Sequence, residues 1–163
     1  MYLFIQLKQL ESWVKMMKKN RNKILIIGSG RLGASIAGKL SAAGLDVVII
    51  DKDVSSFRKL DDEFGGYDIV GDATDLFVLE NEVLINEVNE VIITTNSDNV
   101  NLFIAHICFY VYDVPHIYVR LNDNDKGILL KNTTIKPIYP FSLSFEEYMR
   151  KRSENDNYEN SHS

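Results

Sequence analysis

The sequence predicts a doubly wound α/β fold, in which a parallel β-sheet carries helices on both faces. Three observations lead to this class. Short runs of β-branched residues recur along the chain, segments with apolar residues at helical spacing separate them, and a glycine-rich loop follows the first run. Strands that alternate with helices favour right-handed crossovers and a parallel sheet, and continuous apolar runs are typical of strands covered on both faces. The expected strands are the segments 23–28, 46–51, 67–71, 90–95, 116–121 and, more weakly, 135–140.

Apolar residues three and four positions apart mark the helices between these strands. They form three sets: Leu32, Ile36 and Leu40; Leu76, Leu79 and Val83; and Leu102, Ile104, Ala105 and Cys108. A last helix follows the final strand. Ser144, with Glu147 three residues later, has the pattern of a capping box, so we expect this helix to begin at Ser144.

The chain of 163 residues is long enough for one domain with a sizeable core. We expect an N-terminal extension at 1–22, an α/β domain at 23–141, a C-terminal helix at 142–152 and a tail at 153–163. The tail has one aromatic and no aliphatic residue, a composition that predicts disorder.

The N-terminal extension has two interpretations. Its apolar residues, Leu3, Leu7, Leu10, Val14 and Met17, form one stripe of a helix whose other positions are mostly basic. Such a helix is typical of partner binding or of attachment to a membrane surface. Alternatively, the segment lies upstream of a natural start at Met16 or Met17, and we favour this simpler interpretation.

Composition excludes several classes of protein. The net charge of -5 argues against non-specific nucleic-acid binding. A single cysteine rules out an internal disulfide framework and fits a reducing cytoplasm. The longest apolar run, at 102–112, is interrupted by His106 and is shorter than the ~20 residues that span a bilayer. We therefore expect a cytoplasmic protein without a transmembrane segment.

The loop GSGRLG at 28–33 has the GxGxxG spacing of dinucleotide-binding proteins, between a strand and a helix as that motif requires. Gly28 permits the tight turn, Gly30 lets the backbone approach a pyrophosphate, and Gly33 allows the helix to pack closely on the strand. The helix N-terminus offers N–H groups to phosphates. We expect the whole loop, Gly28, Ser29, Gly30, Arg31, Leu32 and Gly33, to contact a nucleotide in a Rossmann-like fold; the alternative is a turn that only packs the helix.

Two charged residues refine the expected ligand. Asp51 ends the second strand, where a carboxylate accepts hydrogen bonds from an adenosine ribose and repels a 2′-phosphate, so NADP is an unfavourable ligand. Arg31 lies within the loop and is placed to pair with a terminal phosphate in its own subunit or a neighbouring one. A solvated arginine at the helix start is the alternative.

The carboxyl ends of the later strands meet at the same crevice. Asp72 and Ala73 follow the third strand and are expected beside the adenine, although Asp72 or Asp75 is equally suited to cap the next helix. Thr94, Thr95, Asn96 and Asp98 follow the fourth strand, with helix capping by Ser97 or Asp98 as the competing role. Arg120 ends the fifth strand and is expected to meet a phosphate or Asp98, or to form a structural ion pair.

No catalytic constellation is found. His106, His116 and His162 are scattered, Cys108 lies in an apolar helix, and no histidines and cysteines have metal-ligand spacing. We therefore expect a regulatory nucleotide-binding module. The alternative is a small NAD-dependent oxidoreductase domain that needs a partner chain for its substrate site.

The motifs GSGRLG, VVIIDKD, VGDATD, VIITTNSDNVN and YVRLND resemble the RCK N-terminal domain, also called TrkA-N or KTN, of potassium-channel and transporter regulators. The resemblance covers about residues 23–150. It implies that NAD(H), ATP or ADP binds in the crevice, that subunits form dimers and often rings below a membrane potassium pore, and that nucleotide exchange alters gating. It also implies that the nucleotide is lined by Gly28, Gly30, Arg31, Gly33, Asp51, Lys52, Asp72 and Ala73.

Two further expectations concern assembly. The resemblance identifies residues 142–152 as a crossover helix that reaches a partner subunit. The helix at 97–112 is apolar on almost every side, which predicts a subunit interface. The family usually continues into a second ligand-sensing domain that does not follow here, so we expect the complete transport subunit to be longer or to act with a separate chain.

Overall fold

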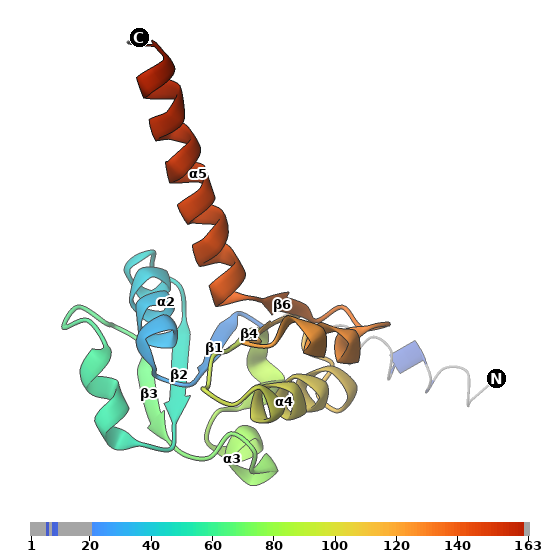
Figure 1. Cartoon of the computed structure of the whole chain (residues 1–163). Helices are drawn as coiled ribbons and strands as arrows, with labels where there is room; N and C mark the ends of the chain where they lie inside the picture. The colour runs from blue at the N-terminus through green and yellow to red at the C-terminus, as the bar shows by residue number, and fades with distance from the viewer. Residues whose placement is uncertain (1–5, 7, 10–20, 162–163) are drawn as a thin grey trace.

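The computed structural model describes residues 6, 8–9 and 21–161, and the predicted extension at 1–22 therefore lies almost entirely outside the described residues. The described chain forms a parallel sheet of six strands in the order β3-β2-β1-β4-β5-β6 (Figure 1). The predicted α/β fold with a doubly wound sheet is confirmed. The strands are β1 Lys23–Ile27, β2 Val47–Asp51, β3 Tyr67–Val70, β4 Val88–Ile93, β5 His116–Arg120 and β6 Lys136–Ile138.

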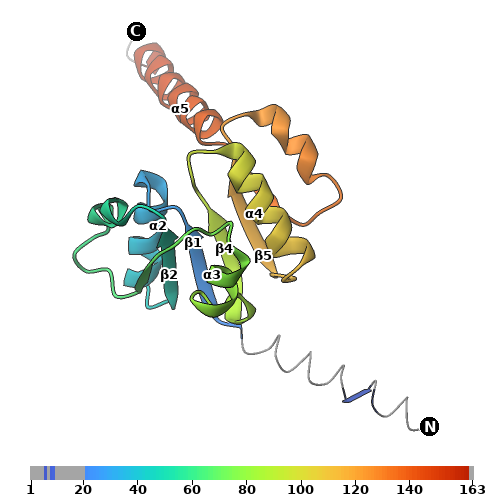
Figure 2. The same ribbon diagram turned by 90° about the horizontal axis from the view of Figure 1, so that it is seen from below.

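Helices connect the strands and cover both faces of the sheet (Figure 2). The α-helices are α2 Arg31–Ala42, α3 Leu76–Asn81, α4 Asp98–Tyr110 and α5 Pro140–Ser161, and short 3-10 helices are η1 Val54–Lys59, η2 Ile85–Glu87 and η3 Asn124–Leu130. The connection between β2 and β3 contains only η1. This half of the sheet therefore has a thinner cover than the half with α4.

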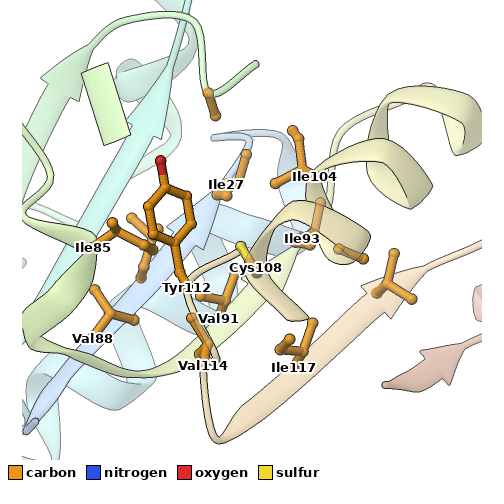
Figure 3. Packing of buried hydrophobic residues seen from close by; sticks show 14 of the residues in the cluster. Ile27, Ile85, Val88, Val91, Ile93, Ile104, Cys108, Tyr112, Val114 and Ile117 are labelled. Carbon is orange, nitrogen blue, oxygen red and sulfur yellow. The ribbon is translucent and has the colours of Figure 1, made fainter. Parts of the chain in front are cut away.

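Alternate residues of each central strand enter two separate cores. In β1, Leu25 and Ile27 join a large cluster with α3 and α4, whereas Ile24 and Ile26 join a smaller one with α2 and η1. Figure 3 shows the larger cluster, with Cys108 of α4 among the side chains of the strands. Burial on both faces explains why these strands appear in the sequence as unbroken apolar runs.

The order of the strands locates the crevice. The chain moves outward from β1 through β2 to β3, then returns to β4 on the other side of β1. The connections after β1 and β4 therefore leave their carboxyl ends in opposite directions. Between them opens the crevice in which doubly wound proteins bind ligands.

The C-terminal helix differs from its prediction. Helix α5 begins at Pro140, four residues before Ser144, and the Ser144 hydroxyl donates to the Pro140 carbonyl at 2.9 Å from within the helix. The capping-box assignment was wrong because proline, whose fixed φ favours the first turn, starts this helix instead. The helix also continues through residues 153–161, where composition predicted disorder. Figure 1 shows α5 projecting away from the sheet beyond β6.

Candidate functional site

A cavity of about 580 Å³ lies at the carboxyl ends of β1 to β4. This volume is within the range of small-ligand sites. Nine residues that the sequence predicted for nucleotide binding line it together: Gly28, Gly30, Asp51, Lys52, Asp72, Ala73, Thr94, Thr95 and Asn96. Segments far apart in the chain thus converge on one space.

The glycine loop has the geometry that its spacing predicted. Gly28 has φ of +98°, and a side chain there would also press on the backbone of Thr95. A Cβ at Gly33 would lie 2.0 Å from the Gly28 carbonyl oxygen, so helix α2 packs against the loop only because position 33 is glycine. At Gly30 the same atom would meet nothing within 4 Å. The cavity side of the loop is therefore open to close approach by a ligand.

Gly30 is also the N-cap of α2 and supplies no side-chain cap. The first backbone N–H groups of the helix are therefore left without a side-chain acceptor where the loop borders the cavity. Such groups, with the positive end of the helix dipole, favour a phosphate.

Asp51 fastens the loop to the end of β2. Its Oδ2 accepts the Ser29 N–H at 2.7 Å, and its Oδ1 accepts the Asp53 N–H at 2.9 Å. Each oxygen retains a further lone pair. The carboxylate can therefore hold the loop and still accept a hydroxyl from a ligand.

Asp72 and Ala73 line the cavity just after β3, the strand next to β2. Ala73 is buried, while Asp72 accepts the backbone N–H and the hydroxyl of Thr74 at 2.9 and 2.7 Å. These hydrogen bonds hold the pKa of Asp72 below its ordinary 3.8. The carboxylate is therefore charged at neutral pH, and its position is fixed by its own turn.

Threonines from β4 complete the cavity. The buried Thr94 hydroxyl donates to the Gly28 carbonyl at 2.9 Å, which links β4 to the glycine loop. The Thr95 hydroxyl donates to Oδ1 of Asn101, whose amide donates to the carbonyls of Thr95 and Arg120 at 3.1 and 2.9 Å. Asn101 is completely buried. These hydrogen bonds from a buried side chain hold the backbone at the end of β4 in place.

Five of the predicted site residues do not line the cavity: Ser29, Arg31, Leu32, Gly33 and Arg120. Ser29 and Gly33 are buried in the loop and support its shape, and Leu32 lies half-buried in α2. Arg31 is exposed at the first position of α2. Arg120 donates to Oδ1 of Asn122 at 3.0 Å and to Oδ1 of Asn96 at 3.5 Å, and not to Asp98, which was one of its expected partners.

The competing capping roles are now resolved. Asp75 caps α3 by accepting the Phe77 N–H at 2.9 Å, and Ser97 caps α4. Asp98 is buried and accepts the N–H groups of Asn122 and Asp123 at 2.9 and 3.0 Å. Asp98 thus joins α4 to the loop after β5 and contributes nothing to the cavity.

Sequence reasoning missed the contribution of η1. Ser56 and Lys59 of this segment line the cavity together with Asp53, its N-cap, in a short turn that no helical or strand periodicity marks. The only available signal was Asp53 two residues before Ser55, an arrangement typical of an Asx turn. The other unpredicted lining residues are Ile27, Ile50, Gly71, Thr74, Ser97, Val100 and Ile104.

The remaining reactive groups lie apart from the cavity. Burial raises the pKa of the Cys108 thiol to about 12, so the thiol is protonated at neutral pH. Both ring nitrogens of His106 face backbone carbonyls, those of Leu102 and Leu129. Among the described residues, no cluster of histidine, cysteine and carboxylate side chains is suited to a metal ion. Within the same residues, no helix has the length and apolarity needed to cross a bilayer.

Solved structures share this architecture. The NAD(P)-binding domain of an exopolyphosphatase-related protein from Archaeoglobus fulgidus is 26% identical, with a TM-score of 0.67, over 82% of this chain and 99% of that one. The structure of GsuK bound to ADP is 25% identical, with a TM-score of 0.65, over 76% and 32% of the two chains. The GsuK channel bound to NAD is 26% identical, with a TM-score of 0.62, over 72% and 21%.

Curated relatives point to the same family. The Trk system potassium uptake protein TrkA of Streptomyces coelicolor is 27% identical over 128 residues, which are 78% of this chain and 57% of that protein. The TrkA homolog of Pyrococcus horikoshii is 34% identical over 104 residues, 64% and 44% of the two chains. The chain thus spans about half the length of these relatives. A model of the TrkA-N domain matches residues 24–139, which confirms the resemblance, and the chain belongs to the TrkA-N domain family.

Proposed function

We propose that this chain is a cytoplasmic regulatory subunit or module of a potassium uptake system or channel, and that it binds NAD(H) or ATP/ADP. The observation that carries the proposal is the cavity at the carboxyl edge of the sheet. There the glycine loop offers an uncapped helix N-terminus, and Asp51 and Asp72 line the cavity at the ends of the neighbouring strands β2 and β3. This combination suits a phosphorylated adenosine.

Related proteins support the potassium system and the nucleotides. The curated relatives are named potassium uptake proteins, and GsuK structures are described as bound to ADP and to NAD. Three carboxylates, Asp51, Asp53 and Asp72, line the cavity of the present chain and disfavour the extra 2′-phosphate of NADP.

The proposed mechanism is a shift between two conformations. A nucleotide that binds one arrangement of the subunits more tightly than another favours that arrangement, and the change reaches a membrane pore through a partner. The chain would lie at the inner face of the membrane through that partner.

Two exposed apolar surfaces support a homodimer or a ring. On α4, Phe103 and Tyr110 are 49% and 69% exposed. On α5, Phe141, Phe145 and Tyr148 are also exposed, on a helix that projects from the body (Figure 1). Large apolar surfaces of this kind are typical of subunit contacts. We propose that α4 and α5 contact other copies of the chain.

Thermal unfolding of the whole chain with NAD, NADH, NADP, ATP, ADP and AMP tests the nucleotide. A ligand that binds only the folded state stabilises it by about 2.7 kcal/mol at a hundredfold excess over its Kd. We expect NAD(H) or ATP/ADP to raise the midpoint and NADP to leave it unchanged. A midpoint that no nucleotide moves would overturn the proposal.

A pair of glycine variants sharpens this test. In Gly30→Ala the added methyl group meets no protein atom, but it occupies the space that a pyrophosphate would approach. We expect nucleotide binding to weaken at least tenfold, which is roughly 1.4 kcal/mol of binding free energy. The unfolding midpoint of the ligand-free chain should change little. The matched control is Gly38→Ala in the same helix, where the nearest atom is 3.7 Å away. Equal affinities of the two variants would argue against phosphate binding at the loop.

A further inference from the structure

Ser56 is a buried polar residue without a hydrogen-bond partner for its side chain. It lies in η1, lines the cavity and is only 6% exposed. Its hydroxyl is buried and unpaired in the described structure. Leaving a buried hydroxyl unpaired costs the folded state free energy, so such a group calls for a partner.

The surroundings of Ser56 connect it to the predicted nucleotide site, because Ser56 is one of the residues that line the cavity. The Ser56 carbonyl accepts the Ser29 hydroxyl at 3.3 Å, and the Ser29 N–H donates to Asp51 at 2.7 Å. Ser56 therefore adjoins both the glycine loop and the carboxylate that ends β2. Rotation about the Cα–Cβ bond, which moves the oxygen between staggered positions, is the movement by which the hydroxyl would meet a ligand in the cavity.

We infer that Ser56 is a specificity residue whose hydroxyl hydrogen-bonds a ribose hydroxyl of the bound nucleotide. The inference rests on the proposed nucleotide binding and identifies how this site distinguishes a ribonucleotide from a deoxyribonucleotide. Asp51 only accepts hydrogen bonds, and each of its oxygens already receives one backbone N–H. The serine hydroxyl both donates and accepts, and it adds the donor that the carboxylate lacks.

The charges around Ser56 favour a neutral hydroxyl over a further phosphate. Lys52 and Lys59 line the cavity, but the carboxylates of Asp51, Asp53 and Asp72 line it too and outnumber them. Hydrogen bonds from the Ser55 hydroxyl and N–H lower the pKa of Asp53, which keeps that carboxylate charged. A phosphate beside Ser56 would therefore meet net negative charge.

Calorimetric titration with ADP, 2′-deoxy-ADP and 3′-deoxy-ADP tests the inference on the full chain and on Ser56→Ala. ADP is the part that NAD(H) and ATP share. We expect the wild-type chain to prefer ADP over one deoxy analogue by about tenfold. In Ser56→Ala we expect this preference to fall several-fold, because affinity for ADP decreases while affinity for that analogue is unchanged.

The neighbouring serine provides a matched control. The Ser55 hydroxyl donates to Asp53 at 2.8 Å, so it already has a partner, and Ser55 is exposed. Ser55→Ala should leave the ribose preference unchanged. Ser56→Ala removes only an unpaired oxygen, so the variant should also fold, with an unfolding midpoint close to that of the wild type.

The outcomes separate the two proposals. Failure of ADP to bind the wild-type chain would overturn nucleotide binding and the inference with it. Tight ADP binding with the same ribose preference in both chains would overturn only the role of Ser56, as would equal losses of affinity for ADP and both analogues. Tighter binding of NADP than of NAD, abolished in Ser56→Ala, would replace the ribose hydroxyl with a phosphate.

Discussion

The two halves of the sheet use polar residues at their carboxyl ends in different ways. After β2 and β3, Asp51 and Asp72 accept hydrogen bonds from backbone that borders the cavity. After β4 and β5, the polar side chains cross-link the structure: Asn101 holds the carbonyls of Thr95 and Arg120, and Asp98 holds the loop after β5. We call the ends of β2 and β3 the open half, because their carboxylates border the cavity, and the ends of β4 and β5 the filled half, because the side chains of Asn101 and Asp98 are used there in buried cross-links.

Residue type alone therefore does not assign a role at the carboxyl edge of the sheet. Aspartates follow strands in both halves, yet Asp51 is half-buried beside the cavity and Asp98 is buried beneath a loop. Helix α2 packs on one face of β1 and β2, and the connection from β2 to β3 adds only η1. Val100 and Ile104 of α4 also line the cavity, so the two halves differ in the hydrogen bonds of their polar groups and not in the presence of a helix.

We expect the largest effect on stability and on nucleotide binding from a substitution in the glycine loop, next to the open half. Gly33→Ala places a methyl group 2.0 Å from the Gly28 carbonyl, so the loop or helix α2 must move. We expect a loss of about 3 kcal/mol in the free energy of unfolding, measured by urea titration, together with loss of nucleotide binding. The control, Gly38→Ala in the same helix, should be neutral or stabilising by up to ~1 kcal/mol. Equal stability of the two variants would contradict the packing described for the loop.

A smaller effect is expected in the filled half. Asn101→Ala leaves two carbonyls and the Thr95 hydroxyl without their partner at a buried site, which we expect to cost about 2–3 kcal/mol in unfolding experiments. Nucleotide affinity should change less than in Gly33→Ala, because Asn101 does not line the cavity. Asn99→Ala, at an exposed position of the same helix, is the control and should cost under ~0.5 kcal/mol. A larger loss of affinity than of stability would remove the distinction between the halves.

The comparison also explains what the sequence could predict. Central strands buried on both faces give short runs rich in β-branched residues, and these runs alternate with segments of helical spacing, so the strand positions and the doubly wound fold were accessible. The glycine spacing, followed by Asp51 at the next strand end, located the open half of the crevice. Contact of these residues with a nucleotide stays a prediction.

The positions of η1, of the Arg120 side chain and of the start of α5 depend on tertiary packing, which the hydrophobic periodicity of the sequence does not predict. Ser56 and Lys59 line the cavity, and the Ser29 hydroxyl, which donates to the Ser56 carbonyl, links η1 to the glycine loop. A short 3-10 segment of this kind has no distinctive sequence pattern. Arg120 turns to Asn122 because the loop after β5 brings that amide close. Helix α5 begins at Pro140 and not at the predicted Ser144, because proline is favourable in the first helical turn and the Ser144 pattern lies within the helix.

The smallest expected effect concerns pH and the open half. Hydrogen bonds from the Thr74 N–H and hydroxyl lower the pKa of Asp72 below 3.8 in the folded state. A depressed carboxyl pKa contributes stability that is present above the unfolded-state value and is lost as pH falls through the folded-state value. The free energy of unfolding of the wild type should therefore decrease more steeply below about pH 4 than that of Asp72→Asn. We expect the difference between the two proteins to stay below ~0.5 kcal/mol, because water screens this exposed group. Asp62→Asn, at an exposed aspartate of the loop before β3, should keep the wild-type slope. If Asp72→Asn kept that slope as well, the hydrogen bonds from Thr74 would not stabilise the charged carboxylate of Asp72, and the turn that fixes this side chain beside the cavity would contribute nothing measurable to stability.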